Sequence, residues 1–423
     1  MESSILIKDA RVIDPKGSFN GKKVSIRIEN GVITEIGKYL KPKKAEVWTE
    51  ENLCVSPGWM DGQAHFRDPG EELKEGLLRG LDAAAAGGFT DVAVLPSTNP
   101  AIDNKAAVAY LKNRSIEGGA ITDAHPIGCI SQHRDGTQLA EMLDMAEEGA
   151  IGFSDDGPVE RVGLIQMALE YLRPSGDVLV IQPHESDINP GATMHEGAVS
   201  TSLGLKGSPA EAESMRLKRD LNILEYTGGR LHIPVVSSAE SIKLIKEAKK
   251  KGLEVTASTT PHHLSFTDEN IASFDGTFRV QPPLRSSKDR KALRNALADG
   301  LLDGICSDHR PENLESNDVE FVLSPNGISG IEATFPATLK ALEKADITRV
   351  IDAMSNANRR IFNMAEVHVE VGAAAKLTLF NPKGDANKDR ISAGVNDPWK
   401  NIEDLKGTVY GIVNGTKNFK LRP

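Results

Sequence analysis

The central part of the chain alternates short apolar runs with segments that have the periodicity of amphipathic helices. DVAVLP precedes KAAVAYLKNR, DVLVIQPHE precedes AEAESMRLKRDLNILEYTG, and LHIPVVS precedes ESIKLIKEAKKKG. Because strand-then-helix order repeated along a chain is typical of parallel β/α units, the pattern predicts an α/β fold. Over residues 54–365 we expect a TIM-like (β/α)8 barrel, with a doubly wound open sheet as the alternative.

The two ends of the chain have a different pattern. Short β-type runs separated by turns rich in Gly, Asp and Asn occur near the start (ILIKDARVID, KVSIRIENGVITEIG) and again near the end (KLTLFNP, GTVYGIVNG). Such runs are typical of antiparallel strands. We therefore predict one small β-sandwich domain that is composed of residues 1–53 and 366–423.

Charge and hydropathy narrow the class of protein. The chain has 50 Lys+Arg and 60 Asp+Glu, a formal net charge of −10, spread along the sequence. This balance argues against nucleic acid or an anionic membrane surface as a partner. No apolar run reaches the roughly 18 residues of a membrane-spanning helix, and the start lacks the order of a signal peptide, so we expect a cytoplasmic protein.

Candidate chemistry rests on histidines rather than cysteines. The chain has 3 Cys, which are far apart and form no CxxC pair, and 10 His. This cysteine usage indicates neither a disulfide framework nor a cysteine zinc site. In a β/α barrel, active residues follow the carboxyl ends of the strands, so polar residues that end the apolar runs are the candidates.

Several of these strand ends together resemble one family. PGWMDGQAHFRDPG, GAIGFSDDG, LHIPVVSSAES, TPHHLSFTDE, FRVQPPLRSSKDR and DGICSDHRPEN are similar, in the same order, to segments of the dihydroorotases, which are cyclic amidohydrolases. The resemblance implies a barrel with a terminal β-sandwich. It also implies opening or closure of a dihydropyrimidine ring amide in pyrimidine biosynthesis by a metal-bound hydroxide, since zinc lowers the pKa of bound water to near neutrality.

The resemblance implies a set of metal positions, and two of them are altered. The first residue of the family's H-x-H pair is Gln63, whereas His65 keeps the second. Val235 occupies the place of a later histidine and cannot ligate a metal. Retained positions are the bridging carboxylate, the histidine after the third strand and the final aspartate, which is also the general base: Asp155, His184 and Asp308.

The substrate-binding positions implied by the resemblance are altered as well. Arg67 is retained, but Ser97 and Gln281 replace two asparagines and Glu312 replaces a histidine. Arg67 is either a clamp for a substrate carboxylate or a partner of Asp308, Glu312 or Asp155 in a metal-free pocket.

These changes lead us to expect no full binuclear zinc centre, and either no metal or one weakly bound divalent ion. Our first hypothesis is a dihydroorotase homologue that is inactive or strongly impaired and acts as a structural or regulatory partner, by analogy with aspartate transcarbamoylase assemblies. The alternative is an active dihydroorotase, or a hydantoinase-like or allantoinase-like enzyme, with a mononuclear metal site. A third hypothesis is that the protein is a sensor, which binds a dihydroorotate-like or carbamoyl aspartate-like anion at Arg67. We also expect a homo-oligomer.

Overall fold

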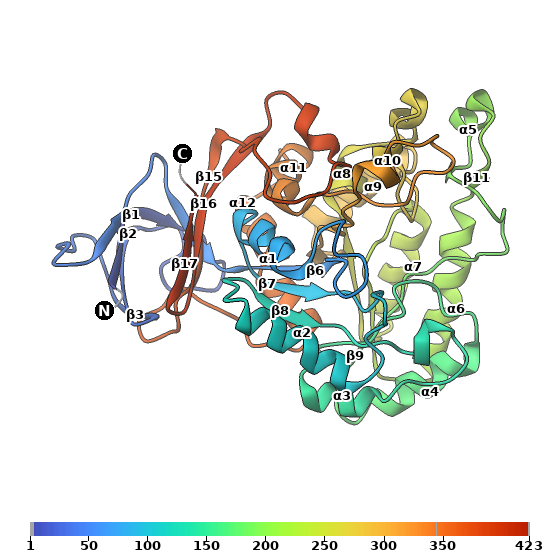
Figure 1. The fold of residues 1–423 in the computed structure, drawn as a ribbon, viewed down its shortest axis with the longest axis horizontal. Coiled ribbons are helices and arrows are strands. Elements are labelled where there is room, and N and C mark those ends of the chain that lie inside the picture. The colour runs from blue at the N-terminus through green and yellow to red at the C-terminus, as the bar shows by residue number, and fades with distance from the viewer. Residues whose placement is uncertain (1–3, 344, 422–423) are drawn as a thin grey trace.

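The computed structural model describes residues 4–343 and 345–421. The outermost positions of the expected terminal domain, 1–3 and 422–423, lie outside the described residues. Figure 1 shows the β-rich terminal domain beside a larger α/β body, with both ends of the chain at the β-rich side. No helix among the described residues is long and apolar enough to cross a membrane.

Both chain ends contribute to one 8-stranded sheet. Its strands are, in sheet order, β17 (Lys417–Lys420), β16 (Lys406–Asn414), β15 (Lys376–Asp385), β5 (Cys54–Pro57), β1 (Ser4–Val12), β2 (Lys23–Glu29) and β3 (Val32–Gly37), and β4 (Glu46–Trp48) pairs with β1. The two halves enclose a shared core that joins Ile7 and Ile26 to Leu377 and Val413. Because β5 pairs with both β1 and β15, this sheet extends past the boundary that we placed before residue 54.

The larger body is a β/α barrel. Its parallel strands form two sheets, of β6 (Trp59–Ala64), β7 (Phe89–Val94) and β8 (Asp123–Pro126), and of β9 (Val178–Val180), β12 (Arg230–Ile233), β13 (Val255–Thr259) and β14 (Gly304–Ile305). Isolated bridges stand at the two seams: Phe153 bridges Gly128 and Leu179, and Ala64 bridges His309. The last bridge links the segment that follows β14 to the end of β6, so a single bridge joins the two sheets at this seam.

Helices surround these strands. They are α1 (Leu77–Ala86), α2 (Lys105–Glu117), α3 (Met142–Glu148), α4 (Val162–Leu172), α6 (Glu211–Thr227), α7 (Ala239–Lys250), α9 (Ser287–Ala298), α11 (Thr334–Ala341), α12 (Ile347–Met354) and α13 (Asn356–Ile361). Shorter elements in the connecting segments are β10 (Met194–His195), α5 (Ala198–Leu203), β11 (Gly207–Ser208), α8 (Pro261–Ser265) and α10 (Leu314–Asn317).

Local sequence explains these helices, as α7 illustrates. The Ser238 hydroxyl caps its first turn by accepting from the Ser241 N–H, and Glu240 lies at the positive end of the helix dipole. Lys249 and Lys250 lie in the last turn, near the negative end. The buried face has the helical spacing of Ile242, Ile245 and Ala248. The helix thus packs its apolar face toward the barrel strands, while Lys249 and Lys250 lie at its carboxyl end.

Candidate active site at the barrel mouth

A cavity of about 350 Å³ lies at the carboxyl ends of the barrel strands. Its lining residues come from the end of β6 and from segments that follow later strands: Gln63, Ser154, Asp156, Gly157, Pro158, Gln182, His184, Ser186, Pro234, Gln281, Arg310 and Asn326. This is the face at which β/α-barrel enzymes place their active sites. Among the predicted site residues, Gln63, His184 and Gln281 line this cavity directly.

Gln63 is bound to the aspartate that we assigned as the general base. Its Nε2–H donates to Oδ1 of Asp308 at 2.6 Å, and both side chains are buried. Burial raises the pKa of Asp308, although the neighbouring Arg310 guanidinium opposes the rise. The Gln63 amide therefore satisfies a carboxylate oxygen that a metal ion would otherwise take.

Both ring nitrogens of His65 have partners within the protein. Nδ1 accepts from the Arg67 backbone N–H at 3.0 Å, so Nε2 carries the proton and donates to the Ser97 carbonyl oxygen at 2.7 Å. Burial, followed by the charge of Arg67, lowers the pKa of His65 to about 3. The ring is thus a neutral, doubly hydrogen-bonded core histidine with no free nitrogen for a metal.

The two aspartates of the SDDG segment point in different directions. We expected Asp155 at the metal site, but its carboxylate accepts from the backbone N–H groups of Ile130 and Ser131 at 2.9 and 3.0 Å and from the Ser131 hydroxyl at 2.6 Å. Asp156, at φ 51°, lines the cavity instead. The carboxylate that faces the cavity is therefore that of Asp156, because the backbone turns at this residue while Asp155 is held by the Ile130–Ser131 segment.

Arg310, which the sequence reasoning did not select, joins the two cavity carboxylates. Its Nε donates to Asp308 Oδ1 at 2.9 Å, and its Nη1 and Nη2 donate to the two oxygens of Asp156 at 2.9 and 2.5 Å. The Ser97 hydroxyl also donates to Asp156, at 2.5 Å. Although burial opposes the change, the Arg310 guanidinium lowers the pKa of Asp156 well below its ordinary value. The sequence feature that could have identified Arg310 is its place inside SDHRPE, two residues after Asp308.

Arg67 pairs with Glu312, one of the alternatives left open by the sequence. Nη2 of Arg67 lies 2.5 Å from Oε1 of Glu312, and Lys74 Nζ lies 3.0 Å from Oε2 of the same carboxylate. Arg67 also contacts Glu71, at 3.2 Å. An anionic ligand at Arg67 must therefore compete with two carboxylates of the protein.

The remaining predicted positions are a mixed set. Val235 is buried, and its backbone oxygen accepts from the Gln182 amide at 3.1 Å. His184 faces the cavity, its buried Nδ1 has no hydrogen-bond partner among the described residues, and burial lowers its pKa. His232 points away to Thr256 and Phe362, as its strand register predicts.

The donor set at the barrel mouth does not fit a binuclear metal centre. Val235 offers no ligand atom, His65 has no free nitrogen, and the Arg310 guanidinium lies against the two carboxylates that face the cavity. Within residues 4–343 and 345–421, no three side chains of His, Cys, Asp or Glu are grouped as a metal site. The arrangement is a cavity lined by amides and hydroxyls around a closed ion-pair network.

Comparisons with known proteins agree with the fold and the motifs. A family model described as dihydro-orotase-like matches residues 53–241. The dihydroorotase of Geotalea daltonii is 37% identical over 97% of this chain and 98% of its own, and that of Pelotomaculum thermopropionicum is 39% identical over 97% of each chain. The L-hydantoinase of Arthrobacter aurescens superposes with a TM-score of 0.81 at 19% identity, over 99% of this chain and 96% of its own. A dihydropyrimidinase of Brevibacillus agri also superposes with a TM-score of 0.81, at 20% identity over 98% and 94% of the two chains. On this full-length similarity, the chain belongs to the dihydroorotase family.

Proposed function

We propose that this protein is a dihydroorotase-family member that does not catalyse metal-dependent ring opening and serves as a structural or regulatory partner in pyrimidine biosynthesis. The observation that carries the proposal is the position of Arg310, whose guanidinium contacts both Asp156 and Asp308 inside the cavity. This pairing supplies the positive charge that two buried carboxylates need. The negative charges of the two aspartates are therefore compensated by a side chain of the protein.

A metal ion at these carboxylates must displace or repel Arg310. Guanidinium stays protonated in proteins, and its planar fork matches a carboxylate bidentately, as it does at Asp156. A divalent cation next to the same oxygens would also meet the positive charge of Arg310. Displacement of the guanidinium and repulsion between the two positive charges both cost free energy of metal binding. These costs support a site with no metal or with one weakly bound divalent ion.

A second candidate is a hydrolase with a single metal ion. Its support is His184, which lines the cavity and whose buried Nδ1 has no hydrogen-bond partner among the described residues, since imidazole nitrogen is a good zinc ligand. Asp156 and Asp308 would complete such a site, with Asp308 as the general base, once Arg310 has moved away. This candidate predicts turnover that depends on added zinc and is abolished by Asp308→Ala.

The volume and lining of the cavity suit a small polar ligand. At about 350 Å³ it lies in the size range of small-molecule sites, and amide and hydroxyl groups dominate its wall. We propose a dihydroorotate-like or carbamoyl aspartate-like molecule as the ligand, aspartate transcarbamoylase as the protein partner, and a homo-oligomer as the assembly. The full-length similarity to dihydroorotases is the support for this choice.

The decisive experiment measures metal and turnover together. Purified protein is analysed for zinc, manganese and iron, and is then assayed for dihydroorotate hydrolysis and carbamoyl aspartate cyclisation with and without added zinc. We expect less than stoichiometric metal and no turnover above background. Zinc-dependent turnover at rates typical of enzymes would contradict the proposal and favour the hydrolase.

A repaired variant tests the physical reason. In Gln63→His/Val235→His/Arg310→Ala two imidazoles are added and the competing guanidinium is removed, so we expect stoichiometric zinc. The matched control Gln63→His/Val235→His keeps Arg310 and should bind zinc more weakly. Equal zinc binding by the two variants would show that Arg310 does not exclude the metal.

The partner proposal has its own test. Sedimentation velocity of the protein alone gives the oligomeric state, and a mixture with aspartate transcarbamoylase from the same cell should sediment as a faster boundary. Unchanged boundaries at micromolar concentrations would remove this partner and leave the metal result unaffected.

A further inference from the structure

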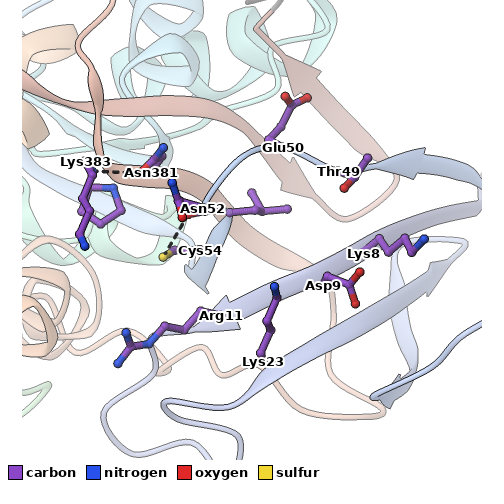
Figure 2. A pocket seen from close by; sticks show the side chains of 12 residues that line it. Lys8, Asp9, Arg11, Lys23, Thr49, Glu50, Asn52, Cys54, Asn381 and Lys383 are labelled. Carbon is purple, nitrogen blue, oxygen red and sulfur yellow. Dashed lines mark hydrogen bonds between the residues drawn. The ribbon is translucent and has the colours of Figure 1, made fainter.

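A second cavity, of about 450 Å³, lies in the terminal β domain. Its wall is formed by Lys8, Asp9, Arg11, Lys23, Thr49, Glu50, Asn52, Leu53, Cys54, Asn381, Pro382 and Lys383, which come from β1, β2, β15, the start of β5 and the segment before it (Figure 2). None of these residues lines the cavity at the barrel mouth. The size lies within the range of small-molecule sites.

Positive charge dominates this cavity although the whole chain has a net charge of −10. Its four cations are Lys8, Arg11, Lys23 and Lys383, and its two carboxylates are Asp9 and Glu50. Glu50 lies 3.5 Å from Lys420, which is outside the cavity. Among the described residues, none of the four cations makes an ion pair. The cavity therefore has a local excess of positive charge.

Two of these cations are placed where they repel each other. Arg11 of β1 and Lys23 of β2 are directly opposite in the antiparallel ladder, so their side chains lie on the same face of the sheet. Like charges at directly opposite positions destabilise a sheet. Figure 2 shows both side chains on the same wall, with Lys383 projecting from the opposite wall. An anion between these groups would remove the repulsion.

The backbone next to this pair is irregular in the same place. The β1–β2 register shifts between Ile7 and Ala10, and Asp9 within the shift has a φ of 54°. Such bulges redirect side chains and are frequent next to functional sites. The bulge places Lys8 and Asp9 on the cavity wall, next to the strand positions that contribute Arg11 and Lys23.

We propose that this cavity binds a small phosphorylated metabolite, with Arg11, Lys23 and Lys383 contacting its phosphoryl oxygens. Guanidinium binds phosphate through two parallel hydrogen bonds, and ammonium groups add compact point charges. Because the unpaired cations outnumber the carboxylates, the preferred ligand has at least two negative charges, as a diphosphate or a nucleotide does. This site is independent of the function proposed for the barrel mouth.

Calorimetry and thermal unfolding test the site on the full chain, with pyrophosphate and ATP as probes. We expect both probes to bind and to raise Tm, and we expect binding to weaken as ionic strength rises. Sulfate at equal ionic strength should give a smaller rise. Tighter binding of ATP than of pyrophosphate would show that the cavity also receives the nucleoside, whereas equal binding would show recognition of the phosphoryl groups alone; both results support the site.

The variant Arg11→Gln/Lys23→Gln separates binding from folding. We expect at least a tenfold loss of pyrophosphate affinity together with an unchanged or higher Tm without ligand, because the variant also removes the like-charge pair. The control Lys246→Gln/Lys291→Gln removes the same charge from the exposed surface of α7 and α9 and should bind as the wild type does. Unchanged affinity in the first variant, an equal effect of sulfate, or no binding of either probe would overturn the proposal.

Discussion

The mouth and the base of the barrel both contain an arginine that is paired with buried aspartate, but the two networks have different surroundings. At the base, Arg359 of α13 pairs with Asp91 of β7, and their side chains are 1% and 0% exposed. At the mouth, Arg310 pairs with Asp156, and the side-chain exposures are 20% and 7%. The Arg359–Asp91 pair is sealed from solvent, whereas the Arg310–Asp156 pair lines a cavity.

The base network also joins the two domains. Lys376 of β15 lies 2.6 Å from Asp91 and 2.9 Å from Asp123, while His125 Nε2 contacts the same Asp91 oxygen at 2.8 Å. Arg359 further donates to the Gly58 carbonyl, just before β6. Burial opposes the change, but these cations lower the pKa of Asp91 well below its ordinary value.

The comparison shows that the same ion pair has different consequences at the two ends of a barrel. At the amino-terminal ends of the strands it joins structural elements, and at the carboxyl-terminal ends it lies in the wall of a cavity, where we expect it to influence which ligands bind. We therefore expect substitutions at the base to change stability alone, and substitutions at the mouth to change stability and ligand chemistry together.

The largest effect is expected for Arg359→Leu. Removing this partner leaves Asp91 buried with reduced charge compensation, which costs about 3–5 kcal/mol of the free energy of unfolding in comparable buried pairs. Urea denaturation followed by circular dichroism measures the loss. The neighbouring Arg360→Leu is the control, because Arg360 forms half-exposed pairs and should cost less than about 1 kcal/mol.

Arg310→Met should destabilise the protein less, by about 2–3 kcal/mol, because water in the cavity can solvate the two carboxylates that lose their partner. The same variant should acquire a response to metal: added zinc raises its Tm and leaves that of the wild type unchanged. Arg310→Lys keeps the charge and should show a smaller response. A zinc-induced rise of equal size in the wild type would contradict the role of Arg310.

The dependence of the free energy of unfolding on pH distinguishes a buried histidine at the base of the barrel from one at the mouth. Burial at the base lowers the pKa of His232 to about 3, whereas the unfolded chain titrates near 6.5. Between these values the unfolded state binds the additional proton, so stability decreases as pH falls, by about 2 kcal/mol from pH 7 to pH 5 for one such group. In His232→Asn this contribution is absent and the stability curve should be shallower.

The matched variant at the mouth is His184→Asn. The pKa of His184 is also lowered by burial, but its ring borders the cavity. We expect its substitution to change the slope of stability against pH less than His232→Asn does. An equal or larger change would show that the mouth histidine is as sealed as the base histidine.

The smallest effect is expected for Lys376→Met, about 1 kcal/mol, because Asp91 keeps Arg359 and His125 as partners. A double-mutant cycle with Arg359→Leu should give a coupling free energy above about 0.5 kcal/mol, since both cations act on one carboxylate. Lys406→Met is the control. Because the pair of Lys406 with Asp385 is exposed, this substitution should leave the free energy of unfolding unchanged. If the effects of Lys376→Met and Arg359→Leu on the free energy of unfolding were strictly additive, the two cations would interact with Asp91 independently.

Part of this protein could be predicted from local sequence alone. The alternation of apolar runs and helical patterns predicted the barrel and the β domain from both ends, because burial of one strand face or helix face leaves a periodic trace. The strand-end motifs predicted the family and also the altered positions Gln63 and Val235. The pairing of Arg67 with Glu312 was among the alternatives that the motifs allowed.

The tertiary structure decided which charged groups meet. The pair of Asp156 with Arg310 spans 154 positions, and that of Asp91 with Arg359 spans 268, so no local pattern contains them. The choice of Asp156 over Asp155 depends on how the backbone turns after Phe153, and the facing of Arg11 and Lys23 depends on strand register. Sequence thus determined the fold and the altered motif, because periodicity and residue type are local properties. Which charged groups compensate one another was determined only by the tertiary structure, because electrostatic energy depends on distance and burial.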